Sequence, residues 1–137
     1  MDNVILNKTE SIERCIRQIR AYFGEDPISF REDQMRQDAI ILNIERACEQ
    51  SISLANHLVR IYKLGFPKTS TESFQLLAEA KLIGTDLSSR LQRMVGFRNI
   101  VVHNYQKINL EIVEKIINEH LEDFTDFSKI AINIIPK

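Results

Sequence analysis

A chain of 137 residues is the size of one ordinary domain, and folding at this length hides about two thirds of the unfolded surface, enough for a core. Its formal net charge of −1 argues against a protein that coats nucleic acid or an anionic membrane by bulk electrostatics. Gly and Pro are scarce, no Trp occurs, and Val, Ile and Leu recur every three to four residues. The sequence therefore predicts an all-α fold rather than a sandwich or barrel.

Two long amphipathic helices are predicted in the first half of the chain. The first runs from about Asn3 to Phe23, where Gly24 with Asp26-Pro27 ends it. The second runs from about Arg31, or somewhat later, to Lys63, where Gly65 and Pro67 stop it. Its apolar face is broad, so we expect it to be the central helix.

Three further helices are predicted in the second half. A short one, from about Ser70 to Lys81, begins with Thr69-x-x-Glu72, the spacing of a capping box. After Gly84, with Thr85 or Asp86 as the cap, a motif helix runs to about His103. One long closing helix begins near Asn109 and turns these residues towards the core: Leu110, Val113, Ile116, Ile117, Leu121, Phe124, Phe127 and Ala131.

The termini and the cysteines indicate a soluble, cytoplasmic protein. Residues 1–4 lack a basic start followed by an apolar run, and no segment reaches the roughly 18 apolar residues that span a bilayer. Cys15 and Cys48 are isolated, without ligand-spaced partners, and are interpreted as small core residues in a reducing cytosol. No repeat or linker divides the chain, which predicts a single domain.

The motif helix carries the residues with chemical potential. Arg98-x4-His103-x-Tyr105 places a cation, an imidazole and a phenol within eight residues of an apolar helix. At 100° per residue, Arg98 lies in the middle of an apolar stripe and needs a partner. Asn99 and His103 are four apart on a polar strip and can touch. The full stripe is Leu91, Met94, Val95, Arg98, Val101, Val102 and Tyr105.

Arg98 and His103 do not converge on an ideal helix, because about 140° and about 7.5 Å of rise separate them. They meet if the helix loosens near His103, if Arg98 bends across, or if two copies of the helix come together. Phe97 and Ile100 form a second apolar side, so this helix has more apolar surface than the core of one helical bundle would use. This favours a symmetric homodimer with both residues of each protomer lining a cleft at the two-fold axis.

These side chains suit metal-independent RNA cleavage. That reaction needs a base, an acid and a cation for the charge that develops on phosphorus. A dimer supplies two copies of His103 for the proton transfers and Arg98 for the phosphate. No ligand-spaced carboxylates, Gly-rich phosphate loop or G-x-S-x-G occur, so neither a metal nor a cofactor is expected.

A purely structural interpretation stands beside this one. Arg98 would pair with an acidic residue such as Asp38, and His103 would cap the end of the helix. Tyr105 would bury its ring and hydrogen-bond its hydroxyl. His57 and His120, which have no acid–base constellation nearby in the sequence, are expected to be structural or surface residues.

The pattern Arg98-Asn99-x3-His103-x-Tyr105 in this helical order resembles the HEPN superfamily and, more narrowly, HepT-like toxins. The resemblance extends to the long second helix with Arg-Gln-Asp-Ala-Ile at 36–40, the turn at 63–67 and the closing helix. It implies a four- to five-helix up-and-down bundle, with residues 1–137 as one HEPN domain that forms a homodimer.

The resemblance also implies a function. It indicates a metal-independent endoribonuclease toxin that cleaves tRNA or other RNA, with Arg98 and His103 catalytic and Asn99 supporting. The implied partner is a nucleotidyltransferase (MNT-fold, MntA-like) antitoxin that adds AMP to Tyr105, bringing an anion towards Arg98 and His103. The alternative is a non-catalytic helical binding module that docks a nucleotidyltransferase as its substrate-positioning subunit.

Overall fold

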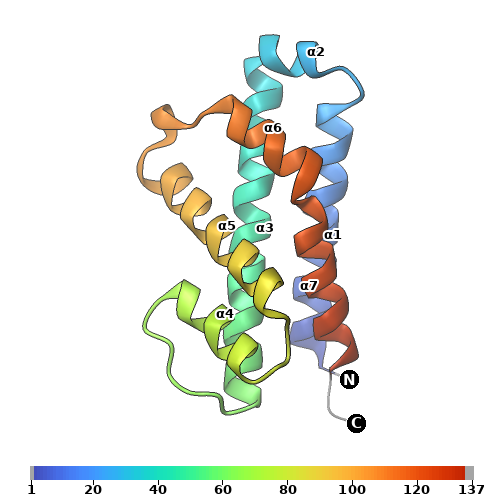
Figure 1. The fold of residues 1–137 in the computed structure, drawn as a ribbon. Helices are drawn as coiled ribbons and strands as arrows, with labels where there is room; N and C mark the ends of the chain where they lie inside the picture. Colours follow the sequence, from blue (N-terminus) through green and yellow to red (C-terminus); the bar gives the residue numbers. More distant parts are fainter. Residues whose placement is uncertain (1, 135–137) are drawn as a thin grey trace.

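The computed structural model describes residues 2–134, which form α-helices and one 3-10 turn and contain no strand (Figure 1). The all-α fold predicted from the sequence is confirmed. In chain order the elements are α1 (Asn3–Phe23), α2 (Pro27–Glu32), α3 (Gln34–Ile61), α4 (Ser70–Glu79), α5 (Thr85–His103), η1 (Tyr105–Lys107), α6 (Leu110–Glu119) and α7 (Leu121–Asn133).

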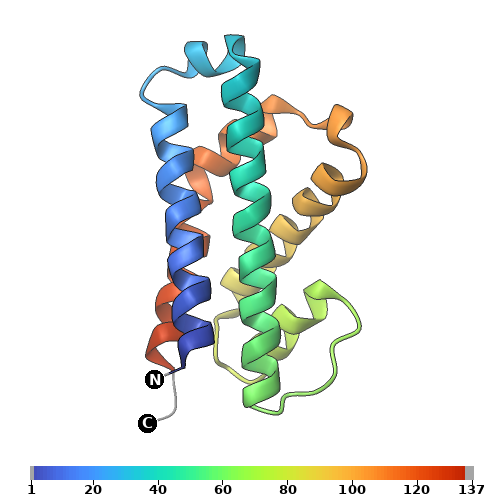
Figure 2. The same ribbon diagram turned by 180° about the vertical axis from the view of Figure 1, so that it is seen from behind.

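The long helix α3 is central, as its broad apolar face predicts. It lies beside α1 along most of its length, and α4, α5 and α7 also pack on it (Figures 1 and 2). The helix α5 crosses α3 obliquely in both views, so its last turns leave the core. Ten residues of the apolar face of α3 are buried: Ile40, Ile41, Ile44, Ala47, Cys48, Ser51, Leu54, Ala55, Leu58 and Val59.

A short helix, α2, occupies the segment that the sequence analysis treated as a break. Asp26 caps it by accepting a hydrogen bond from the Ile28 N–H at 3.0 Å, and Pro27 stands at its first position. The Asp-Pro pair therefore starts a helix as well as ending one, because proline's missing N–H costs nothing there. This short helix buries Phe30, and the centroid of its ring lies 5.3 Å from the centroid of the Phe23 ring.

The single long closing helix predicted from the sequence is wrong. At His120 the backbone leaves helical geometry and separates α6 from α7. Figure 1 shows α6 lying across the bundle while α7 runs along α1. Two short helices each turn an apolar face to the core, which one straight helix in either direction would not achieve. Asp123 secures the break, accepting from Arg90 Nε at 2.8 Å and lying 3.1 Å from His120 Nδ1.

The ends of the middle helices confirm one predicted cap and correct another. The Glu72 N–H donates to Thr69 Oγ1 at 3.3 Å, so Thr69 caps the helix as predicted. The reciprocal bond is shifted by one residue from a standard capping box, because Glu72 Oε2 accepts from the Lys68 N–H at 2.7 Å rather than from that of Thr69. Helix α5 is different: its N-cap is Gly84, with no side-chain hydrogen bond. Thr85 and Asp86 lie inside the first turn, so neither caps the helix as predicted.

A left-handed residue ends α4 and gives a test of local stability. Lys81 has φ of 61°, and the Leu82 N–H donates to Leu77 O at 3.0 Å, the pattern of a Schellman motif. Since a side chain is strained in this region, Lys81→Gly should raise the free energy of unfolding by about 1 kcal/mol. Urea denaturation measures it. Lys115→Gly, inside α6, should instead lower stability by about 1 kcal/mol, and a loss in both variants would contradict the assignment.

Candidate active site

The C-terminal end of α5 sets the geometry of the candidate site. The helix stays regular through His103, and Asn104 ends it with φ of −156° and ψ of 57° while its N–H donates to Ile100 O at 2.8 Å. Tyr105 then begins the 3-10 turn η1. The placement of Tyr105 by continued helical rotation is therefore corrected, because the helix ends two residues before it.

Arg98 is half-buried and anchored on α3. Its Nε donates to Glu49, and its Nη1 donates to Asn99 Oδ1 at 2.6 Å. The prediction that Arg98 needs a partner is confirmed, but the acid is Glu49 rather than Asp38. Since Glu49 is partly exposed to solvent, the pair adds little stability, and its main effect is to orient the guanidinium.

Asp38, the acid considered as a partner for Arg98, binds Tyr105 instead. The tyrosine hydroxyl donates to Asp38, which also accepts from Gln34 Nε2 at 2.8 Å. Partial burial, then this hydrogen bond and the carboxylate charge, raise the pKa of Tyr105 to about 12. The phenol is thus neutral at physiological pH. Its ring remains exposed beside a depression of about 360 Å³ that reaches Gln37 and Ile41.

His103 is exposed at the last residue of α5, and its imidazole makes no hydrogen bond within residues 2–134. The alternative in which it caps the helix through a side-chain bond is therefore not what these residues show. The expected contact between Asn99 and His103 is also absent there, because Asn99 bonds to Arg98 instead. An unengaged imidazole is free to meet a substrate.

One chain does not bring Arg98 and His103 together. Because α5 remains helical through His103, the ideal separation of about 140° and about 7.5 Å applies, and loosening of the helix is ruled out. The bond to Glu49 holds Arg98 against α3, so it does not bend across. Two of the three routes to a shared site are therefore not seen within residues 2–134, and a shared site would need the third, a second copy of the chain.

The outer side of α5 offers a surface for such a copy. Ile100 and Val102 on α5 and Ile112 on α6 are exposed apolar side chains. Between the two helices lies a depression of about 330 Å³ that Ile100, Ile112 and Gly96 help to line. The second apolar side predicted for the motif helix is thus partly confirmed: Phe97 is buried in this chain, whereas Ile100 faces outward.

The remaining histidines and the cysteines take the structural roles expected of them. His57 Nε2 lies 2.6 Å from Asp2 Oδ2, and His120 contacts Asp123. Cys15 and Cys48 are buried and unpaired. Across residues 2–134 no cluster of three or more His, Cys, Asp or Glu side chains suits a metal ion, and no helix has the length and apolar character needed to span a bilayer.

Comparison with known proteins identifies the family. The sequence pattern of the family described as "Ribonuclease HepT-like" matches residues 12–131, most of the chain. This chain belongs to the HepT-like ribonuclease family. Within the family, a protein of Shewanella oneidensis named mRNA nuclease HepT is 47% identical over 127 residues, covering 93% of this chain and 95% of that one.

Solved structures of HepT-like proteins have the same fold. A crystal structure of a toxin–antitoxin with AMP-PNP contains a chain 44% identical, with a TM-score of 0.92 and coverage of 96% of this chain and 99% of that one. A tri-AMPylated Shewanella oneidensis HEPN toxin in complex with an MNT antitoxin is 45% identical, with a TM-score of 0.92 and coverage of 97% and 99%. The HEPN-like bundle implied by the sequence is confirmed.

Two residues of the site were not found from the HepT-like sequence pattern. Glu49, which orients Arg98, and Asp38 in its role towards Tyr105 both lie on α3, far from the motif in sequence. One weak signal points to Glu49: it directly follows the core residue Cys48, whose thiol contacts the carbonyl of Met94 on α5. An acid beside a core position on the central helix is a natural partner for an arginine in an apolar stripe.

Proposed function

We propose that this chain is a metal-independent endoribonuclease toxin whose active site is shared by two copies. One observation carries the proposal: the half-buried Arg98 and the exposed His103 both belong to α5, but one chain keeps them on different sides of the helix. Membership of a ribonuclease family supports a role for these residues in RNA cleavage, and a two-fold axis beside α5 is an arrangement that would unite them.

The shared site accounts for the chemistry with side chains alone. A base takes the proton of a ribose 2′ hydroxyl, the 2′ oxygen attacks the adjacent phosphorus, and the bond to the 5′ oxygen breaks as an acid protonates that oxygen. The two copies of His103 act as base and acid. Arg98, oriented by Glu49 and supported by Asn99, binds the phosphate oxygens and stabilises the charge of the transition state.

The partner in this proposal is a nucleotidyltransferase antitoxin of the MntA kind that silences the toxin by adding AMP to Tyr105. Support comes from the similar HEPN toxin that is tri-AMPylated and in complex with an MNT antitoxin. The RNA is tRNA or another RNA, and the name of the Shewanella relative makes mRNA a specific candidate. We place residues 1–137 in one HEPN domain acting in the cytoplasm.

The direct test is incubation of the purified protein with total RNA in EDTA, with and without Arg98→Ala. Cleavage that persists in EDTA and disappears in Arg98→Ala supports the proposal. Strict dependence on Mg²⁺ points to a different enzyme. A binding module that only docks a nucleotidyltransferase would cleave nothing, and its association with that partner would survive His103→Ala.

The shared site also predicts a homodimer. Light scattering at micromolar concentration should give twice the chain mass of 15.9 kDa. The interface between the two copies should bury at least about 1,000 Å². Because Ile112 is 49% exposed beside α5, Ile112→Asp should dissociate the dimer and abolish cleavage together.

The matched control is Ile132→Asp on α7, an isoleucine 39% exposed, which should remain a dimer and keep its activity. A wild-type protein that scatters as a monomer while cleaving RNA would overturn the shared site.

A further inference from the structure

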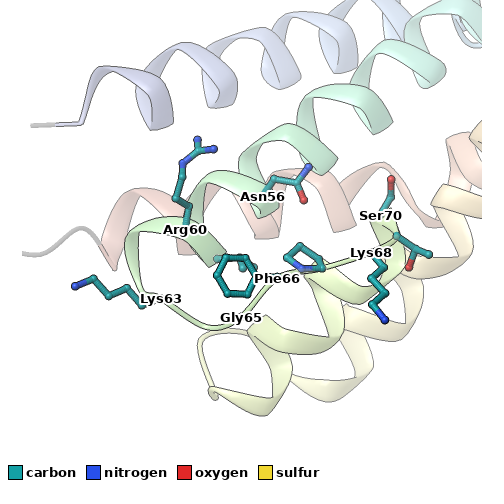
Figure 3. A pocket seen from close by; sticks show the side chains of 10 residues that line it. Asn56, Arg60, Lys63, Gly65, Phe66, Lys68 and Ser70 are labelled. Atoms are coloured by element: carbon teal, nitrogen blue, oxygen red, sulfur yellow. The ribbon is translucent and has the colours of Figure 1, made fainter.

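A second concave surface lies at the far end of α3, away from Tyr105. It is a cavity of about 780 Å³ between the last turns of α3, the connecting loop and the start of α4 (Figure 3). Its wall includes Asn56, Arg60, Lys63, Phe66 and Lys68. Neither the reaction proposed for Arg98 and His103 nor the modification of Tyr105 uses any of these residues.

Phe66 is the unusual member of this cavity. Its side chain is 97% exposed, although burying a phenylalanine stabilises a fold by about 1.5–3 kcal/mol. The neighbouring Gly65 has φ of 138°, a conformation that other residues rarely adopt, and Figure 3 shows the Phe66 ring next to it on the loop. A loop that leaves an aromatic ring in solvent needs a reason outside the fold.

Three cationic residues line the cavity with this ring. In Figure 3 the charged ends of Arg60, Lys63 and Lys68 point away from Phe66 in different directions. Arg60 Nη2 lies 3.3 Å from His57 Nδ1, and none of the three forms an ion pair with an acidic side chain within residues 2–134. No carboxylate belongs to the cavity wall, although the chain has 19 acidic and 18 basic residues. The surface is therefore locally cationic in a nearly neutral protein, which favours an anionic ligand.

We propose that this cavity, the Phe66 site, binds a nucleotide of single-stranded RNA, with the base stacked on Phe66 and the flanking phosphates on Arg60, Lys63 and Lys68. A nucleotide combines a flat π surface with an anion, so it uses both features at once. An acidic protein partner fits less well. Phe66 is the single exposed large apolar side chain in the described wall, whereas protein hot spots are ringed by further contacts that exclude water.

The position of the site defines its role. Arg60 lies eleven residues beyond Glu49 on α3, about 16 Å along the helix, and about 33 Å beyond Asp38. The Phe66 site therefore holds RNA several nucleotides away from the bond that is cut. This inference rests on the proposed ribonuclease function and adds that substrates must extend beyond the scissile phosphate. If this contact is equally strong in the ground state and the transition state, it lowers KM and leaves kcat unchanged.

The test uses the full-length protein and a fluorescent 2′-O-methyl oligoribonucleotide of about 12 nucleotides, which lacks the 2′ hydroxyl needed for cleavage. By fluorescence anisotropy, Phe66→Ala should weaken binding about 10-fold or more, and Phe66→Trp should retain it, since a base stacks on any aromatic ring. Phe66→Leu, apolar but not aromatic, should bind like Phe66→Ala. Lys63→Ala should reduce the slope of log affinity against log salt by about 0.7.

The control is Met35→Ala, which removes another highly exposed apolar side chain and should bind like the wild type. Binding by Phe66→Ala equal to the wild type overturns the inference, even where RNA cleavage proves the proposed function. A Phe66→Ala variant that loses affinity for AMP or ATP but not for the oligonucleotide identifies a free-nucleotide site and overturns it too. A Phe66→Ala variant that loses affinity for the antitoxin but not for the oligonucleotide also overturns the inference. A protein that binds RNA through Phe66 but never cleaves it disproves the nuclease, not this site.

Discussion

His103→Ala and Arg98→Ala should each lower RNA cleavage by two or more orders of magnitude. Positioned proton transfer alone contributes about 10²–10⁴ in rate, and His103 has no other engagement among the described residues that would explain its presence at the end of α5. Arg98 stabilises charge that appears only in the transition state, so its loss should lower kcat and leave KM less changed. Single-turnover cleavage of a defined RNA measures both effects.

The same variants should differ in stability, which separates chemistry from folding. His103 is exposed and unbonded, so His103→Ala should unfold at the wild-type temperature. Arg98→Ala removes a half-buried side chain and leaves Glu49 and Asn99 without their partner, so it should melt slightly lower. Arg98→Lys tests orientation, because lysine keeps the charge but not the planar donors that hold Glu49 and phosphate at once. Undiminished toxicity in His103→Ala would disprove the acid–base role.

The sequence predicted the long helices well because their apolar periodicity persists over many turns. Along α1, Ile5, Ile12, Ile16, Ile19 and Phe23 recur at helical spacing and are all buried, as are the ten residues of the apolar face of α3. Short elements failed for local reasons. Asp26-Pro27 signals a helix start as readily as a stop, and the break at His120 contains neither Gly nor Pro, so nothing in the sequence marks it.

The site was predictable only where one helix determines it. Arg98, Asn99 and His103 lie on α5, so spacing along the chain placed them correctly relative to one another. Which acid of α3 faces each of them depends on how the two helices cross. The antiparallel, oblique crossing sets Arg98 beside Glu49 and Tyr105 beside Asp38. Local periodicity contains no information on that angle, which explains why Asp38 was assigned to the wrong residue.

Tyr105→Phe should remain an active nuclease that the antitoxin can no longer silence by AMP transfer. In that transfer the phenol oxygen bonds to the α-phosphorus of ATP, pyrophosphate leaves, and the phenol proton must be taken up by a base. Since the pKa of Tyr105 is about 12, the hydroxyl does not ionise unaided at physiological pH. Asp38 already accepts its hydrogen bond and is placed to remove the proton, so Asp38→Asn should slow AMP transfer without reducing cleavage.

Mass spectrometry of protein co-expressed with the antitoxin should find one or more AMP groups on the peptide that contains Tyr105. Tyr22→Phe is the matched control, because Tyr22 on α1 is 43% exposed and Tyr105 is 42% exposed. It should be modified and silenced like the wild type. If another peptide carries the nucleotide, or if Tyr105→Phe is still silenced enzymatically, the switch lies elsewhere.

The structure changes how the added AMP is expected to act. Glu49 and Asp38, which hold Arg98 and Tyr105, are about 16 Å apart along α3, so a phosphate on Tyr105 does not pair with Arg98 of the same chain, contrary to the expectation from continued helix. Modification instead replaces the hydroxyl proton that Asp38 accepts with an anion, and the two like charges repel. We expect the turn η1, which begins only two residues after His103, to move away from α3 together with its bulky, negative adduct. We therefore expect the modified protein to lose RNA binding as well as cleavage, and Asp38→Asn to lessen the displacement of η1 when Tyr105 is modified.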